Sequence, residues 1–295
     1  MEKTVVLEKP FNIVSRLQDY VQLTKLRLAS LVVFSAAMSF LLAPVEIIWS
    51  KFFFLILGGF FITGSANGFN QIIERELDKL MDRTMNRPLP DSRITVAEAF
   101  AVCLLLGVVG VFILTFYMNV TCGILGLSAI LLYTVVYTPL KRVTPLAVFV
   151  GAIPGAIPPM LGWVAATNNL GLIAWLLFSI QFLWQFPHFW AIAWVLDDDY
   201  KKAGFNLLPT GKRDKGSAMQ ALLYTICLVP VGLMPFIFHL SGWISMIVIT
   251  SISIYFLFRA YQLYKECSVE AARSLMYASF LYLPIVLIAM VIDKM

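Results

Sequence analysis

Charged side chains are scarce in this sequence of 295 residues. Asp, Glu, Lys and Arg together make up 13% of it, while 60% of its residues are hydrophobic. A soluble domain has about a quarter of its residues charged, so this deficit excludes an ordinary soluble enzyme. The mean hydropathy of +0.84 likewise argues against an ordinary soluble enzyme. The composition therefore predicts a polytopic membrane protein surrounded by membrane lipid.

Cysteine and histidine are also rare. The four cysteines lie far apart, without zinc-ligand spacing or a disulfide framework, and three fall inside apolar runs, which indicates thiols packed in a core. Only two histidines occur, His188 within an apolar run and His239 beside an outer loop. A secretory signal and a mitochondrial transit peptide are both disfavoured, because Glu2, Glu8 and Asp19 interrupt the N-terminal segment.

Nine apolar runs are long enough to cross a bilayer as helices, which takes about 20 residues each. We therefore expect an all-α fold, a single domain over residues 1–295 whose nine transmembrane helices form a bundle around a cytoplasm-facing cavity. Thr95 and Glu98 predict a capping box at the start of the third helix. Several Gly and Pro residues predict that the fifth helix is broken and lies inside the bundle. The runs cover residues 26–45, 49–70, 96–117, 119–138, 144–166, 170–196, 219–240, 243–261 and 274–292.

The basic residues are distributed unevenly over this layout. Of the 22 Lys and Arg residues, only Lys51 and Lys294 fall on one side, and the others, including Lys3 and Lys9, fall on the opposite side. The positive-inside rule then predicts a bacterial inner (plasma) membrane protein whose N-terminus and acidic segments face the cytoplasm, or the matrix in a mitochondrion. The asymmetry also explains the net charge of +5 without a nucleic-acid partner.

Oxygen-bearing side chains follow the second apolar run at intervals of four residues. On an α-helix Asn70, Glu74 and Asp78 share one face, Asp82 has begun to leave it, and Glu76 points elsewhere. Stacked carboxylates at a membrane helix end repel one another unless a cation lies between them. Such hard oxygen ligands suit Mg²⁺, which completes its shell with substrate phosphate oxygens. The alternative is a solvated helix end, with Arg75, Lys79 and Arg83 pairing with the acids.

Two further segments on the same side carry polar residues. Lys141 and Arg142 end the fourth helix, where they either bind a substrate diphosphate or are cations of the membrane interface. The sixth helix has His188 among aromatic residues, as a haem iron ligand, an orienting group or a hydrogen-bonded buried imidazole. It ends in three consecutive aspartates that cannot all face one site, because helix positions are 100° apart. Two acidic helix ends on one side suggest a duplicated bundle with the site between its halves.

Four segments carry a resemblance to a known family. They resemble the UbiA-type intramembrane prenyltransferases and, more narrowly, their haem-farnesylating branch; Pro187-His188-Phe189-Trp190 with Asp198-Asp199-Tyr200 is specific for that branch. The departures are Glu74, where the family usually has aspartate, and the packed aspartate triplet. The segments are Asn70-x3-Glu74-x3-Asp78 with Asp82-Arg83-Thr84-x-x-Arg87-Pro88, then Tyr137-Thr138-Pro139-Leu140-Lys141-Arg142-x-Thr144-Pro145, then Gly155-Ala156-Ile157-Pro158-Pro159-Met160-Leu161-Gly162-Trp163, and finally Pro187 to Trp190 leading to Asp198-Asp199-Tyr200-x-x-Ala203-Gly204.

The resemblance implies a reaction and its residues. Farnesyl diphosphate, haem B and water would give haem O and diphosphate, for the haem of haem-copper oxidases; haem B is a substrate, and Mg²⁺ is the cofactor. The diphosphate needs its charge neutralised before it leaves, and the allylic cation favours aromatic faces, such as those of the sixth helix. By resemblance, Asn70, Glu74, Asp78 and Asp198 hold Mg²⁺ and are catalytic, Arg83, Arg87, Lys141, Arg142 and Asp199 bind the diphosphate, and His188 contacts haem.

Three alternatives compete with this interpretation. A prenyltransferase acting on a quinone or chlorophyll precursor would share the acidic motif but not the haem-branch motif. A secondary transporter would share repeats and broken helices, but would not release diphosphate. A haem-binding assembly factor would bind haem and form no product.

Overall fold

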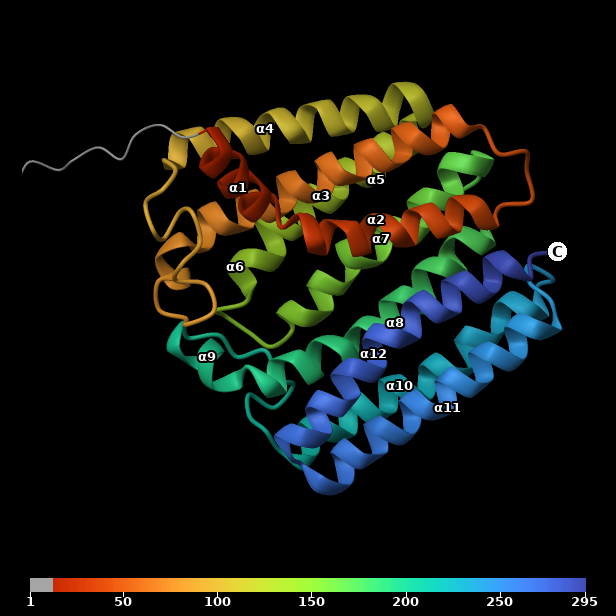
Figure 1. Ribbon diagram of the computed structural model, residues 1–295. Coiled ribbons are helices and arrows are strands. Elements are labelled where there is room, and N and C mark those ends of the chain that lie inside the picture. The colour runs from red at the N-terminus through yellow and green to blue at the C-terminus, as the bar shows by residue number, and fades with distance from the viewer. Residues whose placement is uncertain (1–12) are drawn as a thin grey trace, which may run out of the picture.

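The computed structural model describes residues 13–295, and these are helical apart from their connections and one isolated bridge between Ser241 and Lys294. Lys3, Lys9, Glu2 and Glu8 lie outside the described residues. In order, the helices of Figure 1 are α1 (Ile13–Thr24), α2 (Leu26–Leu42), α3 (Trp49–Asp78), α4 (Val96–Ile113), α5 (Val120–Leu131), α6 (Thr138–Leu140), α7 (Ala147–Thr167), α8 (Leu172–Val195), α9 (Asp197–Lys202), α10 (Lys215–Ile237), α11 (Trp243–Glu266) and α12 (Val269–Ile292), with π-helical turns η1 (Leu114–Met118) and η2 (Leu132–Tyr137).

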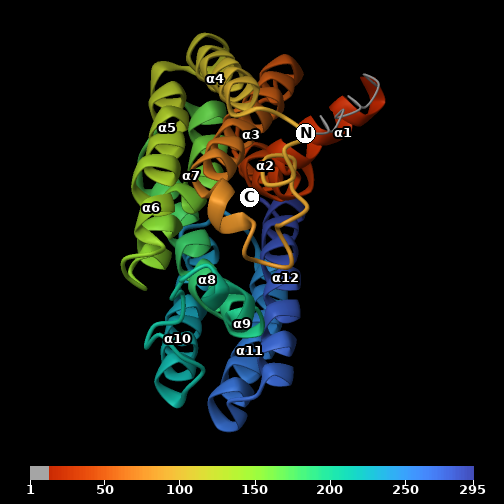
Figure 2. The same ribbon diagram turned by 90° about the vertical axis from the view of Figure 1, so that its left-hand side faces the viewer.

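The predicted membrane architecture is confirmed. In the described part of the chain, eight helices are long and apolar enough to cross a membrane, or nine if α1 and α2 together form one span. These two helices meet at an angle of 51°. The bend lies at Lys25, whose backbone is left-handed at φ 50°, so that the amphipathic α1 projects beside the bundle (Figure 2).

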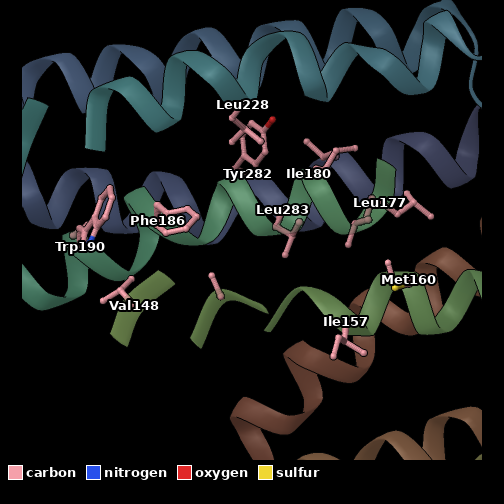
Figure 3. Packing of buried hydrophobic residues seen from close by; sticks show 14 of the residues in the cluster. Val148, Ile157, Met160, Leu177, Ile180, Phe186, Trp190, Leu228, Tyr282 and Leu283 are labelled. Carbon is pink, nitrogen blue, oxygen red and sulfur yellow. The ribbon is translucent and has the colours of Figure 1, made fainter. Parts of the chain in front are cut away.

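Helices α7 and α8 lie at the centre of the bundle. Helix α7 packs against α2 and α8, while α8 also packs against α10 and α12. Figure 3 shows buried side chains of this core, among them Ile157 of α7, Ile180 and Phe186 of α8, and Tyr282 and Leu283 of α12. These side chains are at most 7% exposed. The bundle thus joins its N-terminal and C-terminal halves through buried apolar contacts.

The expected break in the fifth span is absent, because α7 runs as one helix through three prolines. Pro159 has no N–H group to donate to the carbonyl oxygen of Gly155 four residues earlier. The side-chain amide of Gln181 on α8 donates to this oxygen instead, at 2.6 Å. Gln185 similarly donates to the carbonyl of Ala152 at 3.0 Å. Gln181 therefore satisfies the carbonyl group that proline leaves without a helical donor, and Gln185 adds a second hydrogen bond between α8 and α7.

The capping box predicted at the start of α4 is confirmed. The backbone N–H of Glu98 donates to Thr95 Oγ1 at 3.1 Å, and the Glu98 carboxylate accepts from the Thr95 N–H. The same carboxylate accepts a 2.6 Å hydrogen bond from the Tyr20 hydroxyl and pairs with Arg16. Asp19 also pairs with Arg93. The polar face of α1 is therefore held against the start of α4.

We expect Gly162→Ala to destabilise the bundle. A Cβ at Gly162 would overlap the backbone carbonyl oxygen of Ala36 on α2, and backbone cannot move as a side chain does. Overpacking of this kind costs about 1–3 kcal/mol. Gly59→Ala is the control, because its Cβ would meet only a Val33 methyl at 3.2 Å. Thermal unfolding in detergent should show a lower Tm for Gly162→Ala than for Gly59→Ala; equal Tm values would contradict the close α2–α7 contact.

Candidate active site

The polar face predicted on α3 points into the protein. Asn70, Glu74 and Asp78 are 2%, 4% and 0% exposed, which removes a solvated helix end as their explanation. That explanation does hold for Glu76, whose side chain is 66% exposed and pairs with Lys79 at 2.8 Å. The residues at intervals of four are therefore buried, while Glu76, which lies between Glu74 and Asp78 in sequence, is exposed.

Each buried oxygen group meets a cation from a different segment. Lys25 Nζ donates to Asn70 Oδ1 at 3.3 Å, from the bend between α1 and α2. Lys141, after α6, forms an ion pair with Glu74. Arg87, in the loop after α3, donates to both carboxylate oxygens of Asp78, at 2.8 and 2.7 Å.

The two carboxylates are thus compensated in the interior. Lys25 is a residue of this cluster that the sequence does not single out, because it is one of many basic residues on the same side of the predicted layout. Its neighbours Thr24 and Leu26 belong to two different helices. Only the bend between those helices turns its side chain toward Asn70, and no sequence pattern marks that bend.

Lys141 is enclosed by aromatic rings. Its ammonium nitrogen lies 5.0 Å from the ring centre of Tyr137 and 5.3 Å from that of Phe205. Thr138, next to Tyr137, accepts a 3.1 Å hydrogen bond from the amide of Asn70. Arg142, by contrast, is exposed. Of the two cations predicted to bind diphosphate here, the structure brings Lys141 to the α3 face and leaves Arg142 at the surface.

The helix that carries the acidic face continues past the apolar run 49–70 and ends at Asp78. The Asp78 carbonyl oxygen accepts a 2.8 Å hydrogen bond from the Thr84 hydroxyl, while the Asp82 N–H, its partner in a continued helix, donates to Asp199 Oδ1 at 2.8 Å. Local side-chain hydrogen bonds therefore replace the next helical turn.

The three consecutive aspartates of α9 have three different environments. Asp197 is buried and pairs with Lys201 at 2.6 Å. Asp198 has an 81% exposed side chain, 3.0 Å from Arg213. Only Asp199 contacts the loop after α3. Lys202 strengthens the connection between Asp199 and this loop, because its Nζ lies 2.6 Å from an Asp82 carboxylate oxygen and 3.5 Å from an Asp199 carboxylate oxygen.

The connection between Asp199 and the loop depends on its charge. Burial alone would raise the pKa of Asp199, but the backbone N–H groups of Asp82 and Arg83 and the ammonium of Lys202 together lower that pKa. The stability contributed by the carboxylate is therefore present above its ordinary pKa of about 4 and is lost as the pH falls through the lowered value.

His188 lies on α8 against α12. Its ring stacks on Trp184, with 4.5 Å between ring centres, and its Nδ1 lies 2.7 Å from Ser279 Oγ. The Ser279 hydroxyl donates to the Met276 carbonyl at 2.6 Å, so the serine oxygen accepts the hydrogen bond from Nδ1–H. This orientation leaves the lone pair on Nε2, which has no hydrogen-bond partner within residues 13–295.

Most aromatic rings of α8 pack within the bundle core. Phe186 contacts Trp190 and Tyr224 at 5.3 and 4.1 Å between ring centres, and Phe182 stacks on Phe178 at 5.6 Å. These rings therefore help to hold α8 in the core. The rings that surround the Lys141 ammonium are those of Tyr137 and Phe205.

The donor chemistry of the α3 face fits Mg²⁺. No group of three or more His, Cys, Asp and Glu side chains with metal-binding geometry occurs in residues 13–295. Two carboxylates and one amide oxygen nevertheless share this face, and Glu74 Oε1 accepts no hydrogen bond although it lies in an ion pair. Mg²⁺ is typically held by one or two carboxylates together with substrate phosphates. Asn70, Glu74 and Asp78 would hold it in this way.

We expect Asp199→Asn to loosen the loop at residues 79–95. The amide keeps the shape of the carboxylate but loses the charge that attracts Lys202, so hydrogen exchange of this segment at pH 7 should accelerate several-fold. Lowering the pH through the lowered pKa of Asp199, which lies below its ordinary value of about 4, should reduce the protection of this segment in the unmodified protein, measured relative to the intrinsic exchange rate at that pH, because it protonates Asp199. Asp198→Asn is the control, because Asp198 contacts Arg213 and not the loop. Equal exchange in both variants would contradict the assignment.

Sequence comparison finds relatives that match nearly the whole chain. The chain is 52% identical over 282 residues to a protoheme IX farnesyltransferase of Cytophaga hutchinsonii, covering 95% of this chain and 99% of the relative. It is 47% identical to a protoheme IX farnesyltransferase of Christiangramia forsetii, covering 95% and 94% of the two chains.

Solved structures confirm the fold. A digeranylgeranylglyceryl phosphate synthase superposes with a TM-score of 0.80 at 22% identity, covering 95% of this chain and 98% of that one. A UbiA homologue from Archaeoglobus fulgidus, bound to GPP and Mg²⁺, superposes with a TM-score of 0.65 at 16% identity, covering 92% and 99%. The model of the UbiA prenyltransferase family matches residues 31–283. The chain therefore belongs to the UbiA prenyltransferase family.

Proposed function

We propose that this protein transfers the farnesyl group of farnesyl diphosphate to a vinyl group of haem B, with addition of water, giving haem O and diphosphate. One observation carries the proposal: a buried Asn70–Glu74–Asp78 face surrounded by Lys25, Arg87 and Lys141. It occurs in a chain whose relatives, matched over nearly their whole length, are protoheme IX farnesyltransferases. These relatives favour haem over a quinone or chlorophyll precursor as acceptor.

The cations of the site bind the leaving group. Lys25, Arg87 and Lys141 each end in a charged group on a long side chain that now contacts an α3 oxygen. When a diphosphate enters, these groups can turn to phosphate oxygens, where positive charge stabilises the anion that develops as the carbon–oxygen bond breaks. Mg²⁺, when bound, supplies further neutralisation of phosphate charge. Asn70, Glu74 and Asp78 are then free to act as the metal ligands.

Aromatic residues shield the other product of bond cleavage. The allylic cation is attracted to the faces of aromatic rings, and Tyr137 and Phe205 already surround the Lys141 ammonium. The rings also reduce access of water, which would otherwise capture the cation before the haem vinyl group attacks it.

The second acidic segment acts through Asp199. Its carboxylate holds the backbone of Asp82, and Arg83 lies over the Tyr200 ring at 5.7 Å, so the loop that carries Arg87 is tied to α9. This favours Asp199 over Asp198 as the residue of the second motif that serves the site. His188, with its ring oriented by Ser279 and Nε2 available, is the candidate haem contact. The basic side of the bundle would place all of these groups at the cytoplasmic face of a bacterial inner membrane.

The reaction is tested by incubating the purified protein with haem B, farnesyl diphosphate and Mg²⁺ and identifying haem O by mass spectrometry. We expect Asp78→Asn to reduce turnover at least a hundredfold without loss of the folded bundle, since it removes a buried charge from the metal-binding face. Glu76→Gln, on the exposed side of the same helix, should retain activity. Unchanged haem O yield in Asp78→Asn would contradict the role of the face, and no haem O from the unmodified protein would contradict the function.

We expect His188→Ala to weaken haem binding about tenfold or more, with little change in the KM for farnesyl diphosphate. The imidazole is removed from a buried position where its hydrogen bond to Ser279 orients it. Absorbance titration with haem measures the first effect, and diphosphate release measures the second. Equal losses for both substrates would indicate that His188 only supports the packing of α8 on α12.

A further inference from the structure

A basic cleft of about 630 Å³ lies where α1, the start of α2 and the loop after α3 meet. Its charged lining consists of Lys25, Arg27, Arg83 and Arg87, and no described acidic side chain lines it. The remaining lining is two glutamines and aliphatic side chains of α1 and α2. A cavity with four cations, no acid and an aliphatic wall suits an anion that also carries a large apolar surface.

The cleft has an inner and an outer part. Lys25 and Arg87 form the inner part, because their charged groups continue to Asn70 and Asp78 of the buried face. Arg27 and Arg83 form the outer part, where both side chains are exposed. Arg83 lies over the Tyr200 ring, and neither outer arginine forms an ion pair within residues 13–295. Two guanidinium groups are therefore available beside the active site for partners that the protein does not supply.

The two anionic substrates of the proposed reaction differ in shape. Diphosphate is compact and must reach the buried oxygens with their three cations. Haem B is a broad, flat molecule with two propionate carboxylates along one edge and its vinyl groups away from that edge. Guanidinium groups pair with carboxylates through two parallel hydrogen bonds. The outer arginines match the number and the chemistry of the propionates, and the aliphatic wall matches the porphyrin face.

We propose, on the basis of the function proposed above, that the cleft holds the propionate edge of haem B, with Arg27 and Arg83 each binding one carboxylate. The propionates then stay at the membrane surface, where charge is least costly. The vinyl-bearing part of the ring points inward, toward the face where the allylic cation forms. The cleft thereby orients the acceptor and selects porphyrins that carry free carboxylates.

The test compares haem B with its dimethyl ester, which has the same ring and vinyl groups without the propionate charges. The variants are Arg27→Gln and Arg83→Gln, and Arg273→Gln is the matched control, an exposed arginine on α12 outside the cleft. For each protein, absorbance titration gives the Kd for both porphyrins, and turnover gives the KM for haem B and for farnesyl diphosphate.

We expect the unmodified protein to bind haem B about tenfold or more tightly than the ester, the effect of a lost charged hydrogen bond. Arg27→Gln should weaken haem B binding similarly, leave ester binding unchanged, and leave the KM for farnesyl diphosphate within about twofold. Arg83→Gln should weaken haem B binding and leave ester binding unchanged, but its KM for farnesyl diphosphate does not serve as a readout, because Arg83 also holds the loop that carries Arg87. Arg273→Gln should change none of these. In Arg27→Gln, a higher KM for farnesyl diphosphate alone would assign the cleft to diphosphate and overturn the proposal. Equal weakening for haem B and its ester would overturn it too.

The titrations also separate this inference from the proposed function. If the unmodified protein forms no haem O, the function fails, but the preference for haem B over its ester and its loss in the arginine variants still decide whether the cleft binds propionates. If haem O forms and the arginine variants keep the preference, the function stands and the cleft assignment falls.

Discussion

Buried carboxylates need positive charge close by, and this requirement shapes the end of the bundle where α3 ends. Glu74 and Asp78 are almost fully enclosed, where an unpaired charge would cost several kcal/mol. Their compensating cations, Lys141 and Arg87, come from separate segments, and Lys25 adds a third beside Asn70. The oxygens therefore bind together parts of the chain that are distant in sequence. A pairing of mobile cations with fixed oxygens can also be exchanged for pairing with a diphosphate and its metal.

The end of α3 connects this face to the second half of the molecule. A helix normally satisfies its last carbonyl groups with further N–H groups or a cap. Here the Thr84 hydroxyl donates to the Asp78 carbonyl oxygen. The Asp82 N–H, which would bond that oxygen in a continued helix, donates to the Asp199 carboxylate on α9. This exchange of hydrogen-bond partners ends α3 and turns the chain so that Arg87 contacts Asp78. It also links the two acidic segments.

Polar residues within the membrane have two distinct uses in this protein. Gln181 and Gln185 satisfy carbonyl groups of α7, one of them left without a donor by proline, and so permit a proline-rich helix at the bundle centre. Asn70 and Glu74 instead lie on the buried polar face of α3, where Lys25 and Lys141 contact them. The composition of α8 looks functional throughout, yet its amides and most of its aromatic rings serve packing. The chemistry is concentrated where charges from several segments converge.

Local patterns were sufficient for the membrane class, most spans, the capping box at Thr95 and the shared face of Asn70, Glu74 and Asp78, because each depends on helical periodicity or apolar length. They also predicted the family. Tertiary structure alone decided that Lys25 enters the site, that Asp199 rather than Asp198 reaches the loop after α3, and that α3 ends at Asp78. The physical reason is that these outcomes depend on hydrogen bonds and ion pairs between segments far apart in the chain, for which neighbouring residues carry no signal.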